Sequence, residues 1–371
     1  MILQVNKMYD PDIGGVETVV KEYANFLKTY EDIVVLCVNP KFSLRTKIET
    51  IDNVKVYRCA SFGTFLSMPI SIVFFVYLFF LSRKATVIHI HEPFPLASVG
   101  SFLISSKKKI FITWHSDIIK QKSVKKVIEF FQYNLCKKAT KIISTSDRLI
   151  NFSDILSKFR SKIATIPLSL NHGDYSLDEV IDEITLQNLP EEYVLFLGRF
   201  SYYKGIFVLL DAIELIDDNI PFVIAGNGDL SDSIKERITN SKKNIYFVDR
   251  FVTEEEKKLL LKKSKFMVFP STYPSEAFGI IQLESMIYGK PVINTNLETG
   301  VPWVSVDNET GLTVEVSNSV DLAKAISNLY KDTNLYNKLS LGAKNRFNKL
   351  FSSEKTNKDL YNLYYNESNY G

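Results

Sequence analysis

The sequence predicts an α/β protein made of two Rossmann-like domains that face each other, each built on a parallel β-sheet. Short apolar runs alternate with helical stretches along almost the whole chain, as in sheets whose strands are joined by crossover helices and covered on both faces. The 371 residues are enough for two domains with separate hydrophobic cores. An acidic, polar segment at 171–192 separates the two series of runs and is the expected linker.

The expected strands follow in chain order, with helices between most of them. In the first half they are 2–8, 33–39, 54–59, 87–91, 109–115, 141–146 and 163–168, and in the second half 193–199, 221–226, 245–251, 266–271, 291–296 and 311–316. The chain from about residue 319 onward is expected to be helical. The predicted domains are therefore 1–170 and 171–350, and the segment 351–371 is a C-terminal helix that crosses back to the first domain.

Composition excludes several classes of protein. Hydrophobic residues make up 46% and charged residues 23% of the chain, which are ordinary globular values and exclude wholesale disorder. The three cysteines are scattered and form no CxxC pair, so neither a disulfide framework nor a zinc site is expected. The N-terminus reads directly as a strand without a basic, cleavable leader, which favours a cytoplasmic protein.

Charge is distributed unevenly along the chain. Residues 1–170 contain 24 Lys and Arg against 13 Asp and Glu, a net +11, and residues 171–371 contain 21 against 29, a net −8. The signatures of RNA-binding modules are missing, so no nucleic-acid partner is expected. An anionic membrane surface or a phosphorylated substrate accounts better for the lysine clusters at 107–109, 120–126 and 137–141. Ordinary solvated helix faces remain the alternative for each single cluster.

The longest apolar run covers residues 65–81. Its 17 residues are at the lower limit for a membrane span, and the strand at 87–91 must rejoin the sheet directly afterwards. We therefore expect a helix that is partly buried in the first domain and partly placed at a bilayer interface.

Two loops of the first half are candidate ligand sites, because ligands of parallel sheets bind beyond the carboxyl ends of strands. Gly14 and Gly15 precede a helix and allow a ligand to approach its free N–H groups. His115 ends a strand and is expected to face a pocket, with a packed core histidine as the alternative. The nearby Asp10 and Asp12 flank a proline. We interpret this segment as a turn, with a metal-binding DxD motif as the alternative.

Two further loops lie in the second half. Arg199 and Lys204 flank a strand-to-helix loop and can clamp a diphosphate; no acid near them in the sequence is expected to pair with them. Glu276 and Glu284 lie around a helix start at Gly279, and on one continuous helix their side chains would point about 80° apart. The free N–H groups at this helix start suit a phosphate, with one acid reaching the group on each side. Two hydroxyl-rich rings flanking a diphosphate describe a nucleotide sugar.

Taken in order, these motifs resemble glycosyltransferase family 4, retaining enzymes of the GT-B fold, over essentially the whole chain. The family's two glutamates separated by seven residues appear as Glu276 and Glu284. Its phosphate clamp appears as Arg199 and Lys204, and its N-terminal glycine loop as residues 14–15. The resemblance implies a GT-B fold with two facing Rossmann-like domains and a C-terminal crossover helix.

The resemblance also implies roles for these residues. Arg199 and Lys204 would hold the donor diphosphate, Glu284 the ribose and Glu276 the sugar, while His115 would lie over the transferred sugar. Catalysis, assigned to His115, Glu276, Arg199 and Lys204, would proceed by front-face departure of the diphosphate and would need no metal or other cofactor. The full expected donor-binding set is Gly14, Gly15, Arg199, Lys204, Phe251, Ala277, Phe278, Gly279, Ile280 and Glu284.

The segments 115–122, 202–205 and 299–304 also resemble bacterial mannosyltransferases of surface-polysaccharide assembly, which use GDP-mannose. This narrower resemblance implies a lipid-linked saccharide acceptor and a peripheral position on the inner face of the cytoplasmic membrane. The chain departs from the family pattern at Ser169 and, near the expected sugar pocket, at Glu298. A donor of UDP-GlcNAc, UDP-Gal or UDP-Glc therefore remains an alternative.

Other classes of function make different demands on the sequence. A nucleotide-sugar epimerase of the same fold needs catalytic acids in the first domain, which we do not identify. A dinucleotide oxidoreductase needs GxGxxG after its first strand, and "DIGGVE" lacks it. A non-catalytic membrane-surface protein has no need for the two glutamates together with the Arg and Lys pair.

Overall fold

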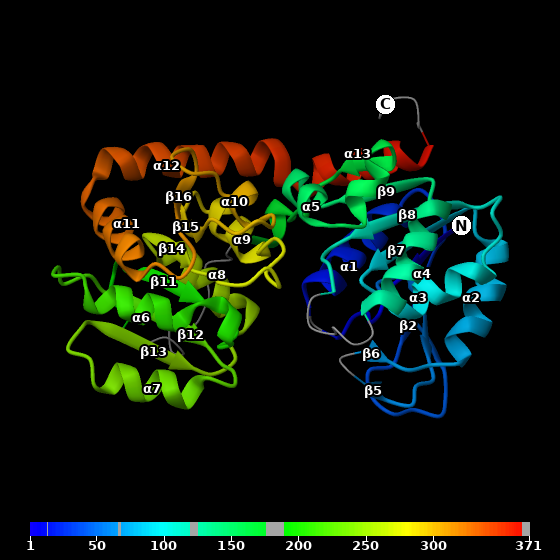
Figure 1. Cartoon of the computed structure of the whole chain (residues 1–371), viewed down its shortest axis with the longest axis horizontal. Coiled ribbons are helices and arrows are strands. Elements are labelled where there is room, and N and C mark those ends of the chain that lie inside the picture. The colour runs from blue at the N-terminus through cyan, green and yellow to red at the C-terminus, as the bar shows by residue number, and fades with distance from the viewer. Residues whose placement is uncertain (13, 66–67, 119–124, 176–188, 366–371) are drawn as a thin grey trace. The chain divides into compact units, whose positions relative to one another are not determined.

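The computed structural model describes residues 1–12, 14–65, 68–118, 125–175 and 189–365 (Figure 1). The chain divides into two compact units: unit 1 comprises Met1–Leu168 and Thr356–Gly371, and unit 2 comprises Ser169–Lys355. These borders differ by a few residues from the sequence-based ones at 170 and 350. Most of the expected linker, residues 176–188, lies outside the described residues.

Unit 1 is built on an eight-stranded sheet in the order β10-β9-β8-β7-β1-β2-β4-β3. Every neighbouring pair is parallel except β3 and β4, so the predicted α/β class with a mainly parallel sheet is confirmed. The strands are β1 (Ile2–Val5), β2 (Ile33–Val38), β3 (Lys47–Ile51), β4 (Val54–Cys59), β7 (Val87–Glu92), β8 (Lys109–Trp114), β9 (Lys141–Ser144) and β10 (Ile163–Thr165). The sequence analysis missed β3, because this edge strand is largely exposed and reads as a polar loop.

Helices cover both faces of this sheet. They are α1 (Gly15–Leu27), α2 (Val73–Lys84), α3 (Pro95–Gly100), η1 (Ser101–Leu103), α4 (Lys125–Lys138), α5 (Asp147–Phe152), η2 (Leu156–Lys162) and α13 (Ser353–Tyr365). The apolar core that α2, α3 and α4 share with the sheet contains Leu3, Ile88 and Ile112. On α13, the ring of Tyr364 lies against His89 and Phe111, so the end of the chain packs on the other face of the same strands.

The predicted helix over residues 65–81 is wrong in its first part. The short strands β5 (Thr64–Phe65) and β6 (Met68–Pro69) pair antiparallel there, and α2 starts only at Val73. Proline lacks the N–H that a helix interior needs, so Pro69 favours the extended start. Within the described ranges, no helix is long and apolar enough to cross a membrane.

Unit 2 is built on a six-stranded, all-parallel sheet in the order β13-β12-β11-β14-β15-β16. Its strands are β11 (Val194–Leu197), β12 (Phe222–Gly226), β13 (Ile245–Asp249), β14 (Phe266–Phe269), β15 (Val292–Thr295) and β16 (Gly311–Val314). Its helices are η3 (His172–Tyr175), η5 (Tyr202–Lys204), α6 (Ile206–Glu214), α7 (Ser231–Thr239), α8 (Glu254–Lys263), α9 (Ile280–Ile287), α10 (Val301–Val304), α11 (Ser319–Lys331), α12 (Thr333–Arg346) and η6 (Phe347–Phe351).

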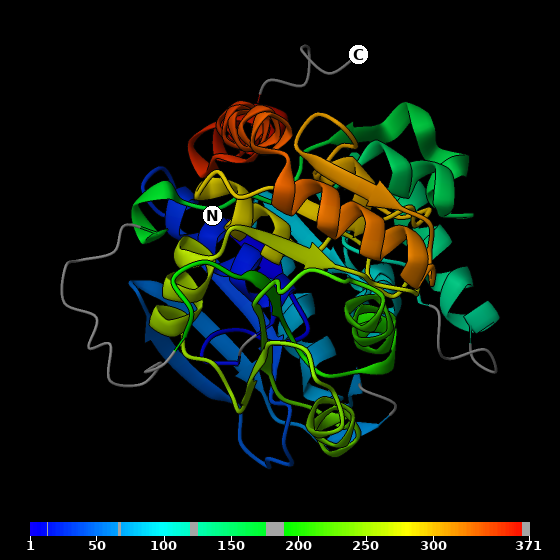
Figure 2. The same ribbon diagram turned by 90° about the vertical axis from the view of Figure 1, so that its left-hand side faces the viewer.

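Alternate side chains of β11 supply two separate cores. Val194 and Phe196 pack with residues of α6 and α11, whereas Leu195 and Leu197 pack with residues of α8. Figure 2 shows this sheet between helices. The chain order reverses at β11, which pairs with β12 on one side and β14 on the other. Such a switch point leaves a crevice at the carboxyl ends of the strands, where open α/β sheets bind ligands.

Candidate functional site

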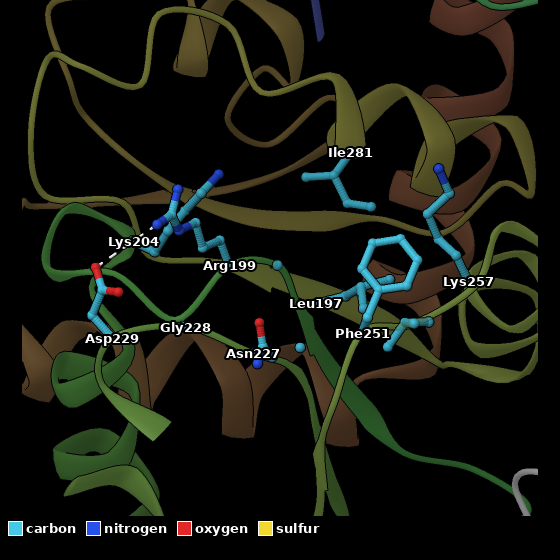
Figure 3. Close-up of a pocket in the computed structure, with 12 residues that line it drawn as sticks. Leu197, Arg199, Lys204, Asn227, Gly228, Asp229, Phe251, Lys257 and Ile281 are labelled. Atoms are coloured by element: carbon cyan, nitrogen blue, oxygen red, sulfur yellow. Dashed lines mark ion pairs between the residues drawn. The ribbon is translucent and has the colours of Figure 1, made fainter. Parts of the chain in front are cut away.

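A cavity of about 670 Å³ lies at this switch point of unit 2. Its walls come from the loop after β11, the glycine-rich turn after β12 and the loop after β13, with one residue each from α8 and α9. Figure 3 shows Arg199 and Lys204 on one side of the cavity and Phe251 and Lys257 on the other. Two cations therefore lie on one side of the cavity, and the exposed ring of Phe251 stands across from them.

Lys204 is placed by a tight turn between η5 and α6. Gly205 has φ +69°, and a Cβ there would stand 1.9 Å from the carbonyl oxygen of Pro270, so only glycine lets the loop after β14 approach. The Nζ of Lys204 lies 2.5 Å from Glu276 Oε2 and 5.0 Å from the centre of the Phe269 ring. Both members of this ion pair are largely buried, so the cation is held in a partly desolvated position.

The expectation that the clamp cations have no acidic partner is wrong. Glu276 pairs with Lys204, and the exposed Asp229 lies 3.8 Å from Arg199. Both acids come from loops after other strands, β14 and β12, which the parallel sheet brings to the same edge. Sequence distance hid these pairs, because neighbours in a parallel sheet are separated by a whole crossover helix.

Glu284 lies inside α9 and is buried. Its Oε1 accepts hydrogen bonds from Lys257 Nζ at 2.6 Å and from the Tyr175 hydroxyl at 2.7 Å. Burial lowers the pKa of Lys257, but Glu284 and Glu254 more than offset it, so the net pKa is raised. Lys257 lines the cavity and thereby connects the carboxylate of Glu284 to its wall.

Sequence reasoning missed Lys257. It lies in the run "EEEKKLLLKK", which reads as an ordinary solvated helix face. The signal that finds it is spatial, namely its approach to Glu284 from the neighbouring helix.

The start of α9 has the form that the sequence predicted, with Gly279 at φ +79° as the N-cap of a helix over Ile280–Ile287. Phe278 points into the protein, where its ring packs near Trp303. The Ala277 carbonyl oxygen accepts a hydrogen bond from the N–H of Gly300. The residue of this segment that lines the cavity is Ile281. The predicted Ala277, Phe278, Gly279 and Ile280 are not among the lining residues.

The remaining predicted site residues, Gly14, Gly15 and His115, belong to unit 1. Gly14 caps α1 and Gly15 is its first residue. A Cβ at Gly14 would stand 2.2 Å from a carboxylate oxygen of Glu17, whose pKa is raised by burial. This glycine thus leaves room for a buried acid in the first turn of α1.

His115 directly follows β8 and is buried. Its backbone N–H donates to the backbone carbonyl of Glu92 at 2.9 Å, and its ring Nε2 lies 3.1 Å from His91 Nδ1. Burial lowers the pKa of His115 to about 3, so the side chain is a neutral imidazole at physiological pH.

The acids of the first loop are engaged by cations. Asp12 lies 2.9 Å from the buried Arg58, and Asp10 lies 3.1 Å from Lys21. In the part of the chain that the structure describes, no group of three or more His, Cys, Asp and Glu side chains could hold a metal ion. The backbone N–H of Asp12 donates to the Tyr9 carbonyl at 3.2 Å, which forms the turn expected at this proline.

Two family profiles together match most of the chain. Residues 13–171 match the profile described as Glycosyltransferase Family 4, and residues 178–346 match Glycosyl transferases group 1. The D-rhamnosyltransferase WbpZ of Pseudomonas aeruginosa is 32% identical over a stretch that covers 74% of this chain and 71% of the relative. The chain belongs to the family of glycosyltransferases that these two profiles describe.

Other relatives agree with this assignment. The O-antigen chain mannosyltransferase C of Escherichia coli is 29% identical to this glycosyltransferase, over 75% of this chain and 74% of the relative. Among solved structures, the sucrose-phosphate synthase of Thermosynechococcus elongatus aligns with a TM-score of 0.78 at 20% identity over 99% of this chain and 98% of its own. Anabaena Alr3699/HepE, solved in complex with UDP, aligns with a TM-score of 0.76 at 16% identity over 98% of both chains. The expected GT-B fold is confirmed.

Proposed function

We propose that this glycosyltransferase transfers mannose from GDP-mannose, with retention of anomeric configuration, to a hydroxyl of a lipid-linked oligosaccharide during synthesis of a bacterial surface polysaccharide. The observation that carries the proposal is the cavity of unit 2, with Arg199 and Lys204 on one side and Phe251 across from them. Two cations match a diphosphate, and an exposed ring offers a surface for a nucleobase.

The acids complete the donor site. Glu284, oriented by Lys257 and Tyr175, accepts hydrogen bonds from the ribose hydroxyls. Glu276, which is ion-paired with Lys204, reaches the sugar on the other side of the diphosphate. The N–H groups at the start of α9 are oriented donors for a phosphate.

Catalysis rests on stabilising the departing nucleoside diphosphate. Negative charge grows on the diphosphate as the glycosidic bond breaks, and Lys204 and Arg199 stabilise that charge more in the transition state than in the ground state. The departing phosphate oxygen takes the proton of the acceptor hydroxyl, which attacks from the same face. We propose His115 as the residue of unit 1 that serves the transferred sugar. This mechanism requires no metal.

The sugar and the pathway rest on the relatives. WbpZ is a D-rhamnosyltransferase and the Escherichia coli relative an O-antigen chain mannosyltransferase, which supports a hexose donor and a surface polysaccharide. The chain departs from the family pattern at Glu298, near the expected sugar pocket. For this reason the UDP-sugars are the second candidate donors.

A donor-only hydrolysis assay with radiolabelled GDP-mannose, UDP-GlcNAc, UDP-Gal and UDP-Glc tests the donor. We expect hydrolysis of GDP-mannose at the highest kcat/KM and release of α-mannose as the first anomer, seen by NMR. Preference for a UDP-sugar would overturn the GDP-mannose assignment, and release of the β-anomer would overturn retention. Conversion of the sugar to its epimer would replace the transferase with an epimerase.

The lipid-linked acceptor is supported by an apolar and basic surface on unit 1. On α4, the exposed side chains follow one face of the helix with spacings of three and four residues. This face consists of Lys126, Val127, Phe130, Tyr133 and Lys137. The helix α2, which packs on the same core as α4, also exposes Val76 and Phe80. Aromatic rings between lysines suit the interface of an anionic membrane, where each lysine contributes about 1 kcal/mol, and such a surface would keep the protein on the inner face of the cytoplasmic membrane.

Co-sedimentation with vesicles tests this part of the proposal. We expect binding to anionic but not to neutral vesicles, with release at high salt because the Debye length shortens. The double variant Lys126→Glu and Phe130→Ser is expected to lose binding while it keeps donor hydrolysis. Lys235→Glu, on the exposed side of α7, makes a comparable charge change elsewhere and serves as the control. If the wild type stays in the supernatant with anionic vesicles, a soluble acceptor replaces the lipid-linked one.

A further inference from the structure

The face of the unit 1 sheet under α13 carries polar side chains where a covered parallel sheet normally carries apolar ones. The alternate positions of the same strands are apolar, for example Leu3 and Ile90. The polar residues are fully buried or nearly so, and they come from three adjacent strands: Gln4 on β1, His89 and His91 on β7, and Thr113 on β8. Buried polar groups are costly unless they are hydrogen-bonded, and these four are bonded to one another and to α13.

The hydrogen bonds begin at Tyr364 of α13. Its hydroxyl lies 2.5 Å from His89 Nδ1, and His89 Nε2 lies 2.7 Å from Thr113 Oγ1. Gln4 Nε2 donates to the same hydroxyl at 3.4 Å. The hydroxyl of Tyr364 thus accepts from Gln4 and also contacts the ring of His89.

The carbonyl oxygen of the Gln4 amide determines where His91 and His115 carry their ring protons. Gln4 Oε1 lies 2.8 Å from His91 Nε2, and a carbonyl oxygen can only accept, so His91 carries its proton on Nε2. The Nδ1 of His91 is then an acceptor. It lies 3.1 Å from His115 Nε2, which must therefore be the donor, and this places the proton of His115 on Nε2 and leaves its Nδ1 bare.

We propose that α13 sets the tautomer of His115 through this chain, with Tyr364, Gln4 and His91 as positioning residues. Burial lowers the pKa of His91 well below its ordinary value and that of His115 to about 3. Both rings are therefore neutral, and each carries its proton on one of its two nitrogens. The bare Nδ1 makes His115 a hydrogen-bond acceptor toward a substrate hydroxyl. The effect on turnover rests on the proposed function, whereas the tautomer itself does not.

NMR of the full chain labelled with ¹⁵N-histidine tests the tautomer directly, because the two ring nitrogens have different shifts when one is protonated. The His115 signals are identified by their loss in His115→Gln. We expect the Nε2–H tautomer in the wild type. The Nδ1–H tautomer in the wild type, which a reversed Gln4 amide would produce, overturns the proposal.

Two matched variants test the role of α13. Tyr364→Phe removes the hydroxyl that orients Gln4, so we expect a mixture of His115 tautomers. Tyr23→Phe is the control, since Tyr23 lies over the His89 and His91 rings and its buried hydroxyl has no hydrogen-bond partner among the described residues. An unchanged tautomer in Tyr364→Phe, or an equal shift in Tyr23→Phe, would overturn the assignment to the hydrogen-bond chain.

Kinetics then connects the tautomer to the proposed reaction. In Tyr364→Phe we expect kcat for donor hydrolysis to fall about threefold to tenfold, the rate equivalent of one hydrogen bond. The affinity for GDP is expected to stay unchanged, because the cavity belongs to unit 2. A shifted tautomer with unchanged kcat overturns the effect on turnover. A wild type that hydrolyses no nucleotide sugar refutes the proposed function instead and leaves the NMR result standing.

Discussion

The ammonium group of Lys204 combines two properties that a charge stabiliser needs. It is largely withdrawn from water, and it is held by Glu276 and the Phe269 ring at the cavity wall. A preorganised cation in such a place does not have to reorient when charge develops on a leaving group, and its interaction is screened less than in bulk water.

We expect Lys204→Ala to lower the turnover of donor hydrolysis by about a hundredfold or more, the usual loss when one preorganised charge stabiliser is removed. Steady-state rates and the thermal midpoint of the variant measure the effect on catalysis and on folding separately. Lys262→Ala, on the exposed side of α8, is the control and should be silent. Near-normal turnover in Lys204→Ala would exclude the diphosphate role.

The two glutamates should differ in what their removal changes. Glu284→Gln weakens an acceptor whose ribose contacts are similar in ground and transition states, so we expect the affinity for free GDP to fall about tenfold. Glu276→Gln should leave that affinity nearly unchanged and lower kcat. Calorimetric titration with GDP and single-turnover rates distinguish the two effects. Equal GDP affinity in wild type and Glu284→Gln would contradict the ribose contact.

At the scale of elements, the start of α8 supports the aromatic side of the cavity. Phe251 and Val252 line the cavity directly before this helix, and Thr253 and Glu256 form a capping box at its N-terminus. Glu256 also accepts from Arg250 at 2.6 Å. The bonds from Arg250 hold the pKa of Glu256 down to about 2, against a contribution from burial in the other direction.

This depressed pKa makes the stability of unit 2 depend on acid. Because the folded-state pKa lies below the ordinary 4.5, the stabilisation is fully present above pH 4.5 and is lost as the pH falls toward 2. We expect Glu256→Gln to cost about 1–2 kcal/mol at pH 7, a value reduced for the exposure of Arg250. In urea titrations the difference from wild type should shrink below pH 4.5. A difference independent of pH would contradict the ionic contribution.

At the scale of the whole chain, α13 connects the end of the sequence to its beginning. Leu360, Leu363 and Tyr364 are fully buried, although α13 starts in the residues of unit 2 and ends in unit 1. Unit 1 is therefore complete only when the last helix has been made, whereas unit 2 is formed by one continuous segment.

Truncation after Lys355 tests this dependence. Loss of three buried side chains removes about 6 kcal/mol of stabilisation by burial, which is comparable to the whole free energy of unfolding of a domain. It also uncovers the polar face with Gln4 and His89. We expect unit 1 to lose cooperative unfolding and become sensitive to proteolysis, while unit 2 still binds GDP. A truncated chain whose unit 1 unfolds at the wild-type midpoint would refute the dependence.

Local sequence determined the elements that the site is built on. Periodicity and turn residues act over a few neighbouring positions. The apolar strands, the helix start at Gly279, the position of His115 after a strand and the strand-to-helix loop with Arg199 and Lys204 could therefore be predicted. The sequence order of these motifs was also enough to predict the GT-B fold through family resemblance. The edge strand β3 was missed because it is largely exposed and reads as a polar loop. The strands β5 and β6 before α2 were missed because each has only two residues.

Only the tertiary structure decided which charges pair and which polar groups share a proton. Glu276 meets Lys204, and Lys257 meets Glu284, because the parallel sheet brings the loops and helices that follow different strands to one edge. The chain of hydrogen bonds from Tyr364 to His115 depends on contacts between the last helix and the first strand. Such contacts leave no periodic trace in the sequence, because periodicity shows which face of a helix or strand a residue lies on but not which distant residue it contacts.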